Sequence, residues 1–392
     1  MSSGPFSDVT ILDLTSVISG PFATAILADQ GARVIKVESM AGDTMRFGGA
    51  MRKGVSSFFM ALNRNKESIA IDLQKQEGVD LILKLAEKAD VCLQNYRPGV
   101  VDRLGIGYEQ LKAVNPAIIY GSISGAGASG PYAERRFYDP VIQAYAGYAN
   151  AQKVNEEPQL IKMMLCDKVT ALTMSQALSA ALYHRARTGE GRHVEVSMLE
   201  SCLYFFWPDR MTSQTFAEEL DFPVPDLNAI YRVLPTQDGF ITFIVISVEE
   251  FRSLATALGR DEWLSDPRFE STQSFRLNYA EVFPDIAHDI ATKSTDEIVR
   301  LFMDADVPFG VVLDEDSILQ DPQVVSEGLI AIHHDTDIGE VRAANRNIRF
   351  SGMETGFQTL APGLSAHRGK VLSDIGLSDD TVSQLVEQGV VG

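Results

Sequence analysis

Short apolar runs alternate with amphipathic segments over the first two hundred residues of the chain. Runs of four to six mostly apolar residues, rich in Val and Ile, are typical of buried strands, and the longer segments between them carry apolar positions at helical spacing. This alternation predicts βαβ units around a mostly parallel sheet, which is an α/β fold. The expected strands are residues 9–14, 33–37, 91–94, 117–122 and 192–197, and the expected helices are 21–29, 76–88, 108–114 and 168–187.

The pattern changes after residue 211, where a polar segment that contains proline predicts a linker over 212–229. Residues 230–325 then have the pattern of a smaller α+β domain, and residues 326–392 form a C-terminal segment. In the small domain we expect a strand over 240–248 and helices over 249–258, 279–292 and 295–304, and in the C-terminal segment a strand over 341–350 and a helix over 379–388.

Length and charge narrow the class of protein. A chain of 392 residues has room for two or three domains. With 34 Lys and Arg against 53 Asp and Glu, its net charge of −19 argues against a nucleic-acid-binding or membrane-coating protein, because phosphates would be repelled. A small phosphorylated ligand held by a local group of arginines stays compatible with this charge.

Cysteine and histidine usage excludes two further classes. Cys92, Cys166 and Cys202 are too few and too scattered for a disulfide framework or a zinc ribbon. No histidines have metal-ligand spacing, and the neighbours His333 and His334 would point to opposite faces of a strand, so no metal site is expected.

The N-terminus lacks the pattern of a signal peptide and no apolar stretch is long enough to span a bilayer, so we expect a cytoplasmic protein without membrane partners.

Asp167 stands where a loop meets the long predicted helix 168–187. The pattern favours an N-cap role, in which the carboxylate accepts the free N–H groups of the first turn. The helix dipole would keep that carboxylate ionised, and an ionised carboxylate can attack an activated acyl group. The adjacent Cys166 is either a thiol activated by the same helix terminus or, as its residue type favours, a small buried apolar residue.

Two other features concern phosphates. The turn after the first strand, residues 15–20, lacks the G-x-G-x-x-G pattern, which argues against a dinucleotide cofactor. Four arginines stand on segments expected near the ends of strands, where they are either solvated surface charges or ligands for phosphate: Arg97, Arg103, Arg135 and Arg136.

Taken together in order, the local motifs resemble those of the class III CoA-transferases, a family that includes formyl-CoA and carnitine CoA-transferases and has α-methylacyl-CoA racemases as relatives. Each motif is short, but the similarity runs through nearly the whole chain. The matching segments are residues 11–15, 20–22, 27–38, 42–46, 63–72, 95–105, 120–131, 188–191, 266–269, 311–323 and 350–352.

The resemblance implies that Asp167 is the catalytic carboxylate of a transferase that moves coenzyme A from a donor acyl-CoA to an acceptor carboxylic acid. Mixed anhydrides and an aspartyl-CoA thioester would be the intermediates, with coenzyme A as substrate, no permanently bound cofactor and no metal. The segments that contact CoA in the family match Ser19, Ile71, Asp72, Asn95, Tyr96, Arg97, Arg103, Arg136, Phe137 and Tyr138.

The same resemblance implies an architecture. A Rossmann-like large domain would be built from residues 1–211 and from the returning C-terminal segment, with the small domain between them. Two such chains would interlock as a homodimer.

Three departures from the family's patterns bear on the reaction. Tyr138 stands where the racemases have a histidine, so the two-base proton shuttle at the α-carbon lacks its partner. Ile18 stands where formyl-CoA transferases have glutamine, and their glycine-run flap is missing, which favours a less polar or larger acyl group than formyl or oxalyl.

Three alternatives stay open: an acyl-CoA racemase or epimerase, or an acyl-CoA lyase, on the same scaffold; an enzyme that uses Cys166 as nucleophile; and a CoA-thioester binder without activity. The acyl pocket could involve four aromatic residues that are equally compatible with a core role, Phe205, Phe206, Trp207 and Tyr231.

Overall fold

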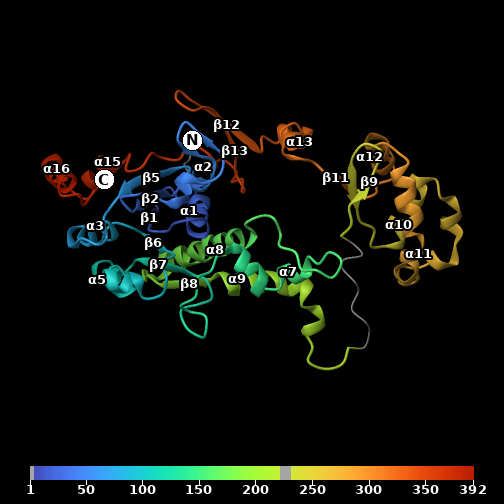
Figure 1. Cartoon of the computed structure of the whole chain (residues 1–392), viewed down its shortest axis with the longest axis horizontal. Helices are drawn as coiled ribbons and strands as arrows, with labels where there is room; N and C mark the ends of the chain where they lie inside the picture. The colour runs from blue at the N-terminus through green and yellow to red at the C-terminus, as the bar shows by residue number, and fades with distance from the viewer. Residues whose placement is uncertain (1–3, 221–230) are drawn as a thin grey trace. The chain divides into compact units, whose positions relative to one another are not determined.

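The computed structural model describes residues 4–220 and 231–392 (Figure 1). These fall into two compact units, one comprising the described residues up to 217 together with 327–392, and the other the described residues between 218 and 326. Each unit has its own apolar core. Of the predicted linker 212–229, residues 221–229 lie outside the described part of the chain.

A parallel six-stranded sheet with strand order β5-β2-β1-β6-β7-β8 forms the centre of the first unit (Figure 1). The five strands that the pattern predicts are confirmed within a few residues, and β5 is an additional strand. Because the order reverses between β1 and β6, the loops that follow these two strands diverge and leave a crevice at their carboxyl ends. The strands are β1 (Thr10–Asp13), β2 (Arg33–Glu38), β5 (Lys66–Ala70), β6 (Val91–Gln94), β7 (Ile119–Ser124) and β8 (His193–Ser197).

Helices cover both faces of this sheet. On one face α1 (Ser19–Asp29) packs along α8 (Leu165–Thr188), and their apolar side chains join those of α9 (Met198–Arg210) in one core. On the other face α3 (Gln76–Ala86) and α5 (Tyr108–Val114) form a second core with α15 (Arg368–Asp374), a helix of the C-terminal segment.

The C-terminal segment belongs to this same unit. Val391 forms a β-bridge with Ile71, next to strand β5, and the Gly392 N–H donates to the Ala70 carbonyl at 3.0 Å. Instead of a strand over 341–350, the structure has a hairpin of β12 (Ile330–Asp335) and β13 (Gly339–Ala344), followed by α15 and α16 (Asp379–Glu387).

In the second unit, the antiparallel strands β9 (Leu234–Pro235), β10 (Phe240–Phe243) and β11 (Phe309–Val311) pack with α10, α11 and α12. The predicted strand 240–248 is too long: it ends at Phe243, and Ser247 forms a capping box with Glu250 that starts α10. The α-helices in the described part of this unit are α10 (Val248–Leu258), α11 (Thr272–Ala291), α12 (Thr295–Asp304), α13 (Glu315–Ile318) and α14 (Pro322–Ser326).

The remaining strands and α-helices in the described part of the first unit are short. They are β3 (Met51–Arg52), β4 (Val55–Ser56), α2 (Ser57–Asn63), α4 (Val100–Leu104), α6 (Asp139–Tyr145) and α7 (Tyr148–Ala151). Among the residues that the structure describes, no helix has the length and apolar character needed to cross a membrane.

Candidate active site

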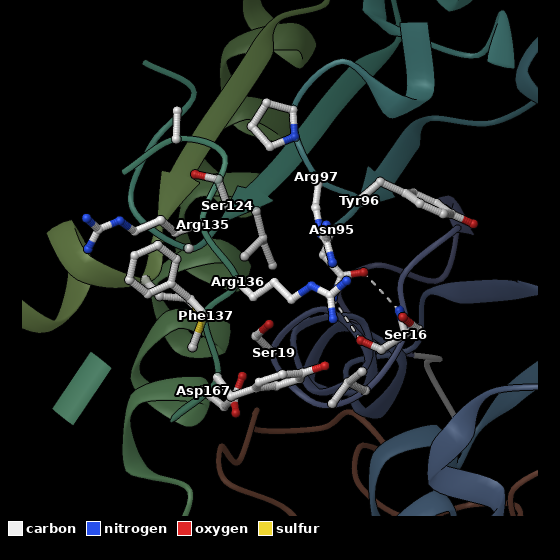
Figure 2. Close-up of a pocket in the computed structure, with 17 residues that line it drawn as sticks. Ser16, Ser19, Asn95, Tyr96, Arg97, Ser124, Arg135, Arg136, Phe137 and Asp167 are labelled. Carbon is white, nitrogen blue, oxygen red and sulfur yellow. Dashed lines mark hydrogen bonds between the residues drawn. The ribbon is translucent and has the colours of Figure 1, made fainter. Parts of the chain in front are cut away.

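A cavity of about 320 Å³ lies at the crevice where the strand order reverses (Figure 2). The loops after β1 and β6 form two of its walls, and the loop between β7 and α6 forms a third. Asp167 reaches it from the first turn of α8. Of the residues expected at a CoA site, the structure brings eight to this one cavity: Ser19, Asn95, Tyr96, Arg97, Arg136, Phe137, Tyr138 and Asp167.

Asp167 is not the N-cap that the pattern predicts. The helix α8 begins at Leu165, two residues earlier, so Asp167 is the third residue of its first turn. Its own N–H is satisfied by the Oδ2 atom of Asp139, at 3.0 Å. Because the Asp167 side chain does not cap the helix, it is available to the cavity, which it lines with only 8% of the residue exposed.

Opposing influences act on the Asp167 carboxyl group. Burial, and next the nearby carboxyl group of Asp139, raise its pKa to about 6, while hydrogen bonds from the Ser19 hydroxyl and backbone N–H act in the lowering direction. Ser19 is the first residue of α1, so the amino ends of α1 and α8 both lie beside Asp167 and favour negative charge there. Asp167 is therefore mostly ionised at neutral pH but poorly solvated.

Asp139 and Gln143 hold this arrangement in place, and the sequence pattern did not reveal them. Gln143, on α6, donates to the Asp139 Oδ1 atom at 2.6 Å and to the carbonyls of Ile161 and Met163 at 3.1 Å. The Ile161 N–H donates back to Gln143 at 2.9 Å. Together these contacts fix the loop that leads into α8. The only local signal is the Asp-Pro pair at the start of α6, which is typical of a helix N-terminus.

Three arginines give the cavity a positive wall inside an acidic protein. Figure 2 shows the Arg136 side chain reaching across the cavity toward Ser16. Arg135 donates to the Tyr145 hydroxyl at 3.0 Å, whereas within the described chain neither Arg97 nor Arg136 forms an ion pair with a carboxylate. The available guanidinium groups suit an anionic ligand such as phosphate or carboxylate.

Three of the residues expected at the CoA site do not line this cavity. Ile71 is 1% exposed and joins the bridge to Val391, and the Asp72 N–H donates to the Val390 carbonyl at 2.9 Å. Arg103 lies on α4 with its guanidinium near Gly99 and is not among the residues that line the cavity.

Other candidates are placed in the core. Cys166 is fully buried, and its contact with Cys202 and its burial both raise the pKa of the thiol, so it has neither access nor the ionisation of a nucleophile. Phe206 also belongs to the core. Ile18 is 7% exposed and does not line the cavity, whereas its neighbour Val17 does, so the size and polarity of Ile18 do not define the acyl site directly.

A second cavity of about 200 Å³ continues the crevice toward β8. It shares Tyr96, Arg97 and Ser124 with the first cavity, and its far end contains His193, whose Nε2 atom lies 2.8 Å from the Ser122 hydroxyl. No histidine lines the first cavity, where Tyr138 flanks Asp139 instead. Across the described residues, no three His, Cys, Asp or Glu side chains are grouped to hold a metal ion.

Comparisons with known proteins agree on one family. Residues 6–368 match the family model described as CoA-transferase family III. The chain is 32% identical, over 100% of its own length and 89% of the other, to a protein named acyl-CoA transferase from Fusarium pseudograminearum. It is also 32% identical, over 99% of its length and 98% of the other, to the succinyl-CoA–D-citramalate CoA-transferase of Chloroflexus aurantiacus.

A solved structure shows the same architecture. The CAIB/BAIF family protein from Brucella suis superposes with a TM-score of 0.82, at 29% identity over 95% of this chain and 100% of the other.

Proposed function

Because this chain belongs to CoA-transferase family III and is an enzyme of that class, we propose that it transfers coenzyme A between carboxylic acids through covalent intermediates on Asp167. The observation that carries this proposal is the buried Asp167 carboxylate, which faces an arginine-walled cavity at the amino ends of two helices. Such a group is ionised, poorly solvated and open to a ligand on one side, as a carboxylate nucleophile requires.

The first half of the reaction loads the enzyme. An oxygen of Asp167 attacks the thioester carbonyl of the donor, the C–S bond breaks, and a mixed anhydride and CoA thiolate result. The thiolate then attacks the Asp167 carbonyl carbon and expels the donor acid as a carboxylate. Asp167 is left as an aspartyl-CoA thioester, and no proton is gained or lost in the sum.

The second half reverses these steps with another acid. The acceptor carboxylate attacks the aspartyl-CoA carbonyl, forms a second anhydride and releases CoA thiolate. The thiolate attacks the acceptor's carbonyl, which yields the new acyl-CoA and restores Asp167. One thioester is exchanged for another, so the overall step is close to energy-neutral.

The surroundings of Asp167 serve these steps in distinct ways. The donors of Ser19 and the end of α1 stabilise negative charge that develops near the carboxylate. The small cavity limits the water that would hydrolyse an anhydride. We assign the CoA phosphates and amides to the crevice residues Asn95, Tyr96, Arg97, Phe137 and Tyr138; the contacts with CoA expected for Ile71, Asp72, Arg103 and Arg136 stay predictions.

We propose that the acyl group carries a second carboxylate. Arg136 and Asp167 line the same cavity, so a guanidinium is available to an anionic group of the acyl chain that binds there (Figure 2). The relative from Chloroflexus aurantiacus is named for succinyl-CoA, whose acyl group has this form. A free carboxylate would form charge-assisted hydrogen bonds with the guanidinium.

Trapping of the enzyme-bound thioester tests the proposed function. The purified protein is incubated with succinyl-CoA or acetyl-CoA, treated with hydroxylamine and digested for mass spectrometry. A hydroxamate on Asp167, formed faster from succinyl-CoA, is the expected result, and the Asp167→Asn variant should give none. The Asp80→Asn variant, an exposed residue on α3 that does not line the cavity, serves as the matched control. If the wild-type protein transfers CoA without modification of Asp167, the covalent mechanism is wrong.

We further propose that two chains form a homodimer. The described part of the first unit exposes several large aromatic side chains on α8 and α9, among them Tyr183 (69%), Tyr204 (84%) and Phe205 (59%). Exposed groups of this kind mark surfaces that bind another protein, and a second copy of the chain is the partner that the family resemblance implies.

A further inference from the structure

The turn between β1 and α1 has a strained backbone next to the candidate nucleophile. Val17 has φ = 70°, in the left-handed region that a β-branched residue rarely adopts. Val17, Ser16 and Ser19 all line the cavity with Asp167. Strain of this kind persists only where the surrounding structure fixes the conformation, and it is concentrated at functional sites.

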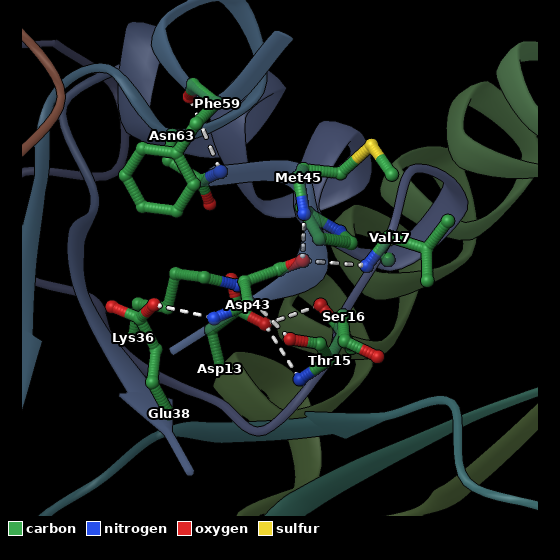
Figure 3. Close-up of polar contacts among 12 residues, drawn as sticks. Asp13, Thr15, Ser16, Val17, Lys36, Glu38, Asp43, Met45, Phe59 and Asn63 are labelled. Carbon is green, nitrogen blue, oxygen red and sulfur yellow. Dashed lines mark hydrogen bonds and ion pairs between the residues drawn. The ribbon is translucent and has the colours of Figure 1, made fainter. Parts of the chain in front are cut away.

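A buried ion pair fixes this turn from one side (Figure 3). The Asp43 Oδ1 atom accepts from the Val17 N–H at 3.3 Å and from the Met45 N–H at 2.9 Å. Its Oδ2 atom lies 3.0 Å from the Lys36 Nζ atom, and Lys36 also donates to the Thr15 carbonyl at 3.0 Å. The pair therefore holds backbone groups on both sides of Ser16.

Asn95 fixes the turn from the other side. Its side chain accepts from the Ser16 N–H at 2.9 Å and donates to the Ser16 carbonyl at 2.8 Å. Asn95 follows β6, so these two bonds tie together the two loops that open the crevice. At the start of the turn, Asp13 accepts from the Thr15 N–H at 3.0 Å. Thus residues 15–17, which lead to Ser19, are contacted by side chains from three places in the sheet. These are β1, β2 with the loop after it, and the loop after β6.

The burial of the pair is hard to explain by stability alone. The Lys36 and Asp43 side chains are 0% and 1% exposed, and both lose their hydration on folding. A buried ion pair is often no more stabilising than apolar side chains of the same size, so its presence is weak support for a purely structural role. Its contacts instead converge on the backbone of the strained turn.

We propose that Lys36 and Asp43 are positioning residues for the CoA-transfer reaction, because they hold the Thr15–Ser19 turn so that the donors of Ser19 face Asp167. This inference rests on the proposed function. Neither side chain lines the cavity or touches a substrate there; both act through the backbone of the turn.

The test compares four variants with the wild-type enzyme, and Ser19→Ala serves as a fifth, reference variant for the pH–rate profile. Asp43→Ala removes the acceptor of the Val17 N–H, and Asp43→Asn keeps an oxygen that can accept it. Lys36→Met/Asp43→Leu replaces both charges with apolar side chains, so the fold can survive while the contacts to the turn are lost. The control is Asp29→Asn, which breaks the buried pair with Arg64 at the opposite end of α1.

For each variant, kcat, KM for the acyl-CoA and the acidic limb of the pH–rate profile are measured. Asp43→Ala and the double variant should lose between about 10- and 100-fold in kcat, with KM changed far less, since a small displacement near reacting groups has effects of this size. Asp43→Asn should retain more activity than Asp43→Ala. Asp29→Asn should keep the wild-type kcat even if its thermal stability falls.

The acidic limb separates positioning from general damage. The groups that face Asp167 are Asp139 from α6 and Ser19 from α1. With Asp139 unchanged, loss of the Ser19 donors leaves the Asp167 carboxylate less stabilised, so the limb should move to higher pH in Asp43→Ala and in the double variant, as it should in Ser19→Ala.

The outcomes distinguish this inference from the proposed function. If wild-type Asp167 forms no adduct, the proposed function and this role fail together. If the adduct forms and Asp43→Ala and the double variant keep the wild-type kcat and acidic limb, only the role of the pair is wrong. An equal loss of kcat in Asp29→Asn would also overturn it. Should Asp43→Ala not fold, the double variant decides the question.

Discussion

The Asp167 carboxyl group is ionised at neutral pH and yet poorly hydrated, a combination that a carboxylate exposed to water does not have. Burial and Asp139 raise its pKa to about 6, and the donors of Ser19 limit that rise. A carboxylate with a higher pKa and a thin hydration shell is a stronger nucleophile toward a thioester. The environment of this one residue therefore supplies much of what the proposed first step needs.

We predict that kcat/KM for the acyl-CoA falls as the pH drops below about 6, because protonation of Asp167 removes the nucleophile. Asp139→Asn takes away the second cause of the raised pKa, so the acidic limb should move to lower pH without reaching the ordinary value. Steady-state rates between pH 4.5 and 8 measure both effects. Glu134→Gln, an exposed charge on the nearby loop, is the control. A limb unaffected by Asp139→Asn would contradict this account of the electrostatics.

Asp167 should also make the fold less stable at neutral pH. Its pKa is raised from 3.8 to about 6 on folding, so the charged form is disfavoured in the folded state, and stability is lost as the pH rises through that interval. Asp167→Asn mimics the neutral form and should raise the free energy of unfolding at pH 7 by up to about 3 kcal/mol. Denaturant melts at pH 7 and pH 4 provide the measurement, and the gain should nearly vanish at pH 4. An equal gain at both values would mean that charge is not the cause.

At the residue scale, sequence alone could indicate Asp167 and the arginines but not the groups that hold them. Asp139 contacts Asp167, which lies 28 residues further along the chain. Gln143 contacts the 161–163 loop, which lies 18 to 20 residues further along. No local pattern encodes these pairs, since each depends on how α6 packs against α8. The N-cap prediction for Asp167 was wrong for a related reason: an aspartate suits either the cap or the first turn, and the helix begins at Leu165.

At the element scale, strand β5 shows why a search for apolar runs can miss a strand of the main sheet. Two of its five residues, Lys66 and Ser68, are polar and fully or nearly fully buried. Lys66 pairs with Asp13 at 2.9 Å, and the Ser68 hydroxyl donates to Glu38 at 2.7 Å, so their partners come from β1 and β2. A strand whose polar side chains are satisfied by distant residues looks like a surface segment in the sequence.

The amino end of α1 should tolerate no side chain at Gly20. A Cβ atom there would lie 2.3 Å from the Thr15 Cβ atom, and Thr15 is held by Asp13 and Lys36. Gly20→Ala should therefore destabilise the fold by about 1–3 kcal/mol and lower kcat, in spite of the better helix propensity of alanine. Gly369→Ala, in the open first turn of α15, is the matched control and should be neutral or stabilising. Thermal melts of the two variants decide this, and equal stability would contradict the close packing described for the turn.

At the scale of the whole molecule, charge is distributed unevenly. The chain carries a net charge of −19, but the first cavity is lined by Arg97, Arg135 and Arg136. The overall charge of the sequence argues against nucleic-acid partners, and only the fold shows that these arginines meet at one crevice. The parallel sheet was predictable from alternating apolar runs because its central strands are buried on both faces.

The proposed homodimer predicts a specific effect of a surface charge. Phe205→Asp places a carboxylate on the exposed aromatic part of α9 and should shift the sedimentation coefficient from that of a dimer to that of a monomer. Met303→Asp, at a 68% exposed position on α12, should leave the assembly unchanged. Sedimentation velocity at micromolar protein measures both. A wild-type protein that sediments as a monomer would contradict the dimer outright.

The central claim is that Asp167 carries the transferred CoA, and transfer of isotopic oxygen tests it most directly. In the proposed sequence, an acceptor oxygen becomes the bridge of the second anhydride and stays on Asp167 when CoA thiolate attacks the acceptor's carbonyl. Turnover with an acceptor labelled in its carboxylate with ¹⁸O, followed by peptide mass spectrometry, should therefore place the heavy isotope on the side chain of Asp167. Formation of labelled acyl-CoA with no heavy oxygen on Asp167 would show that CoA passes directly between the two acids.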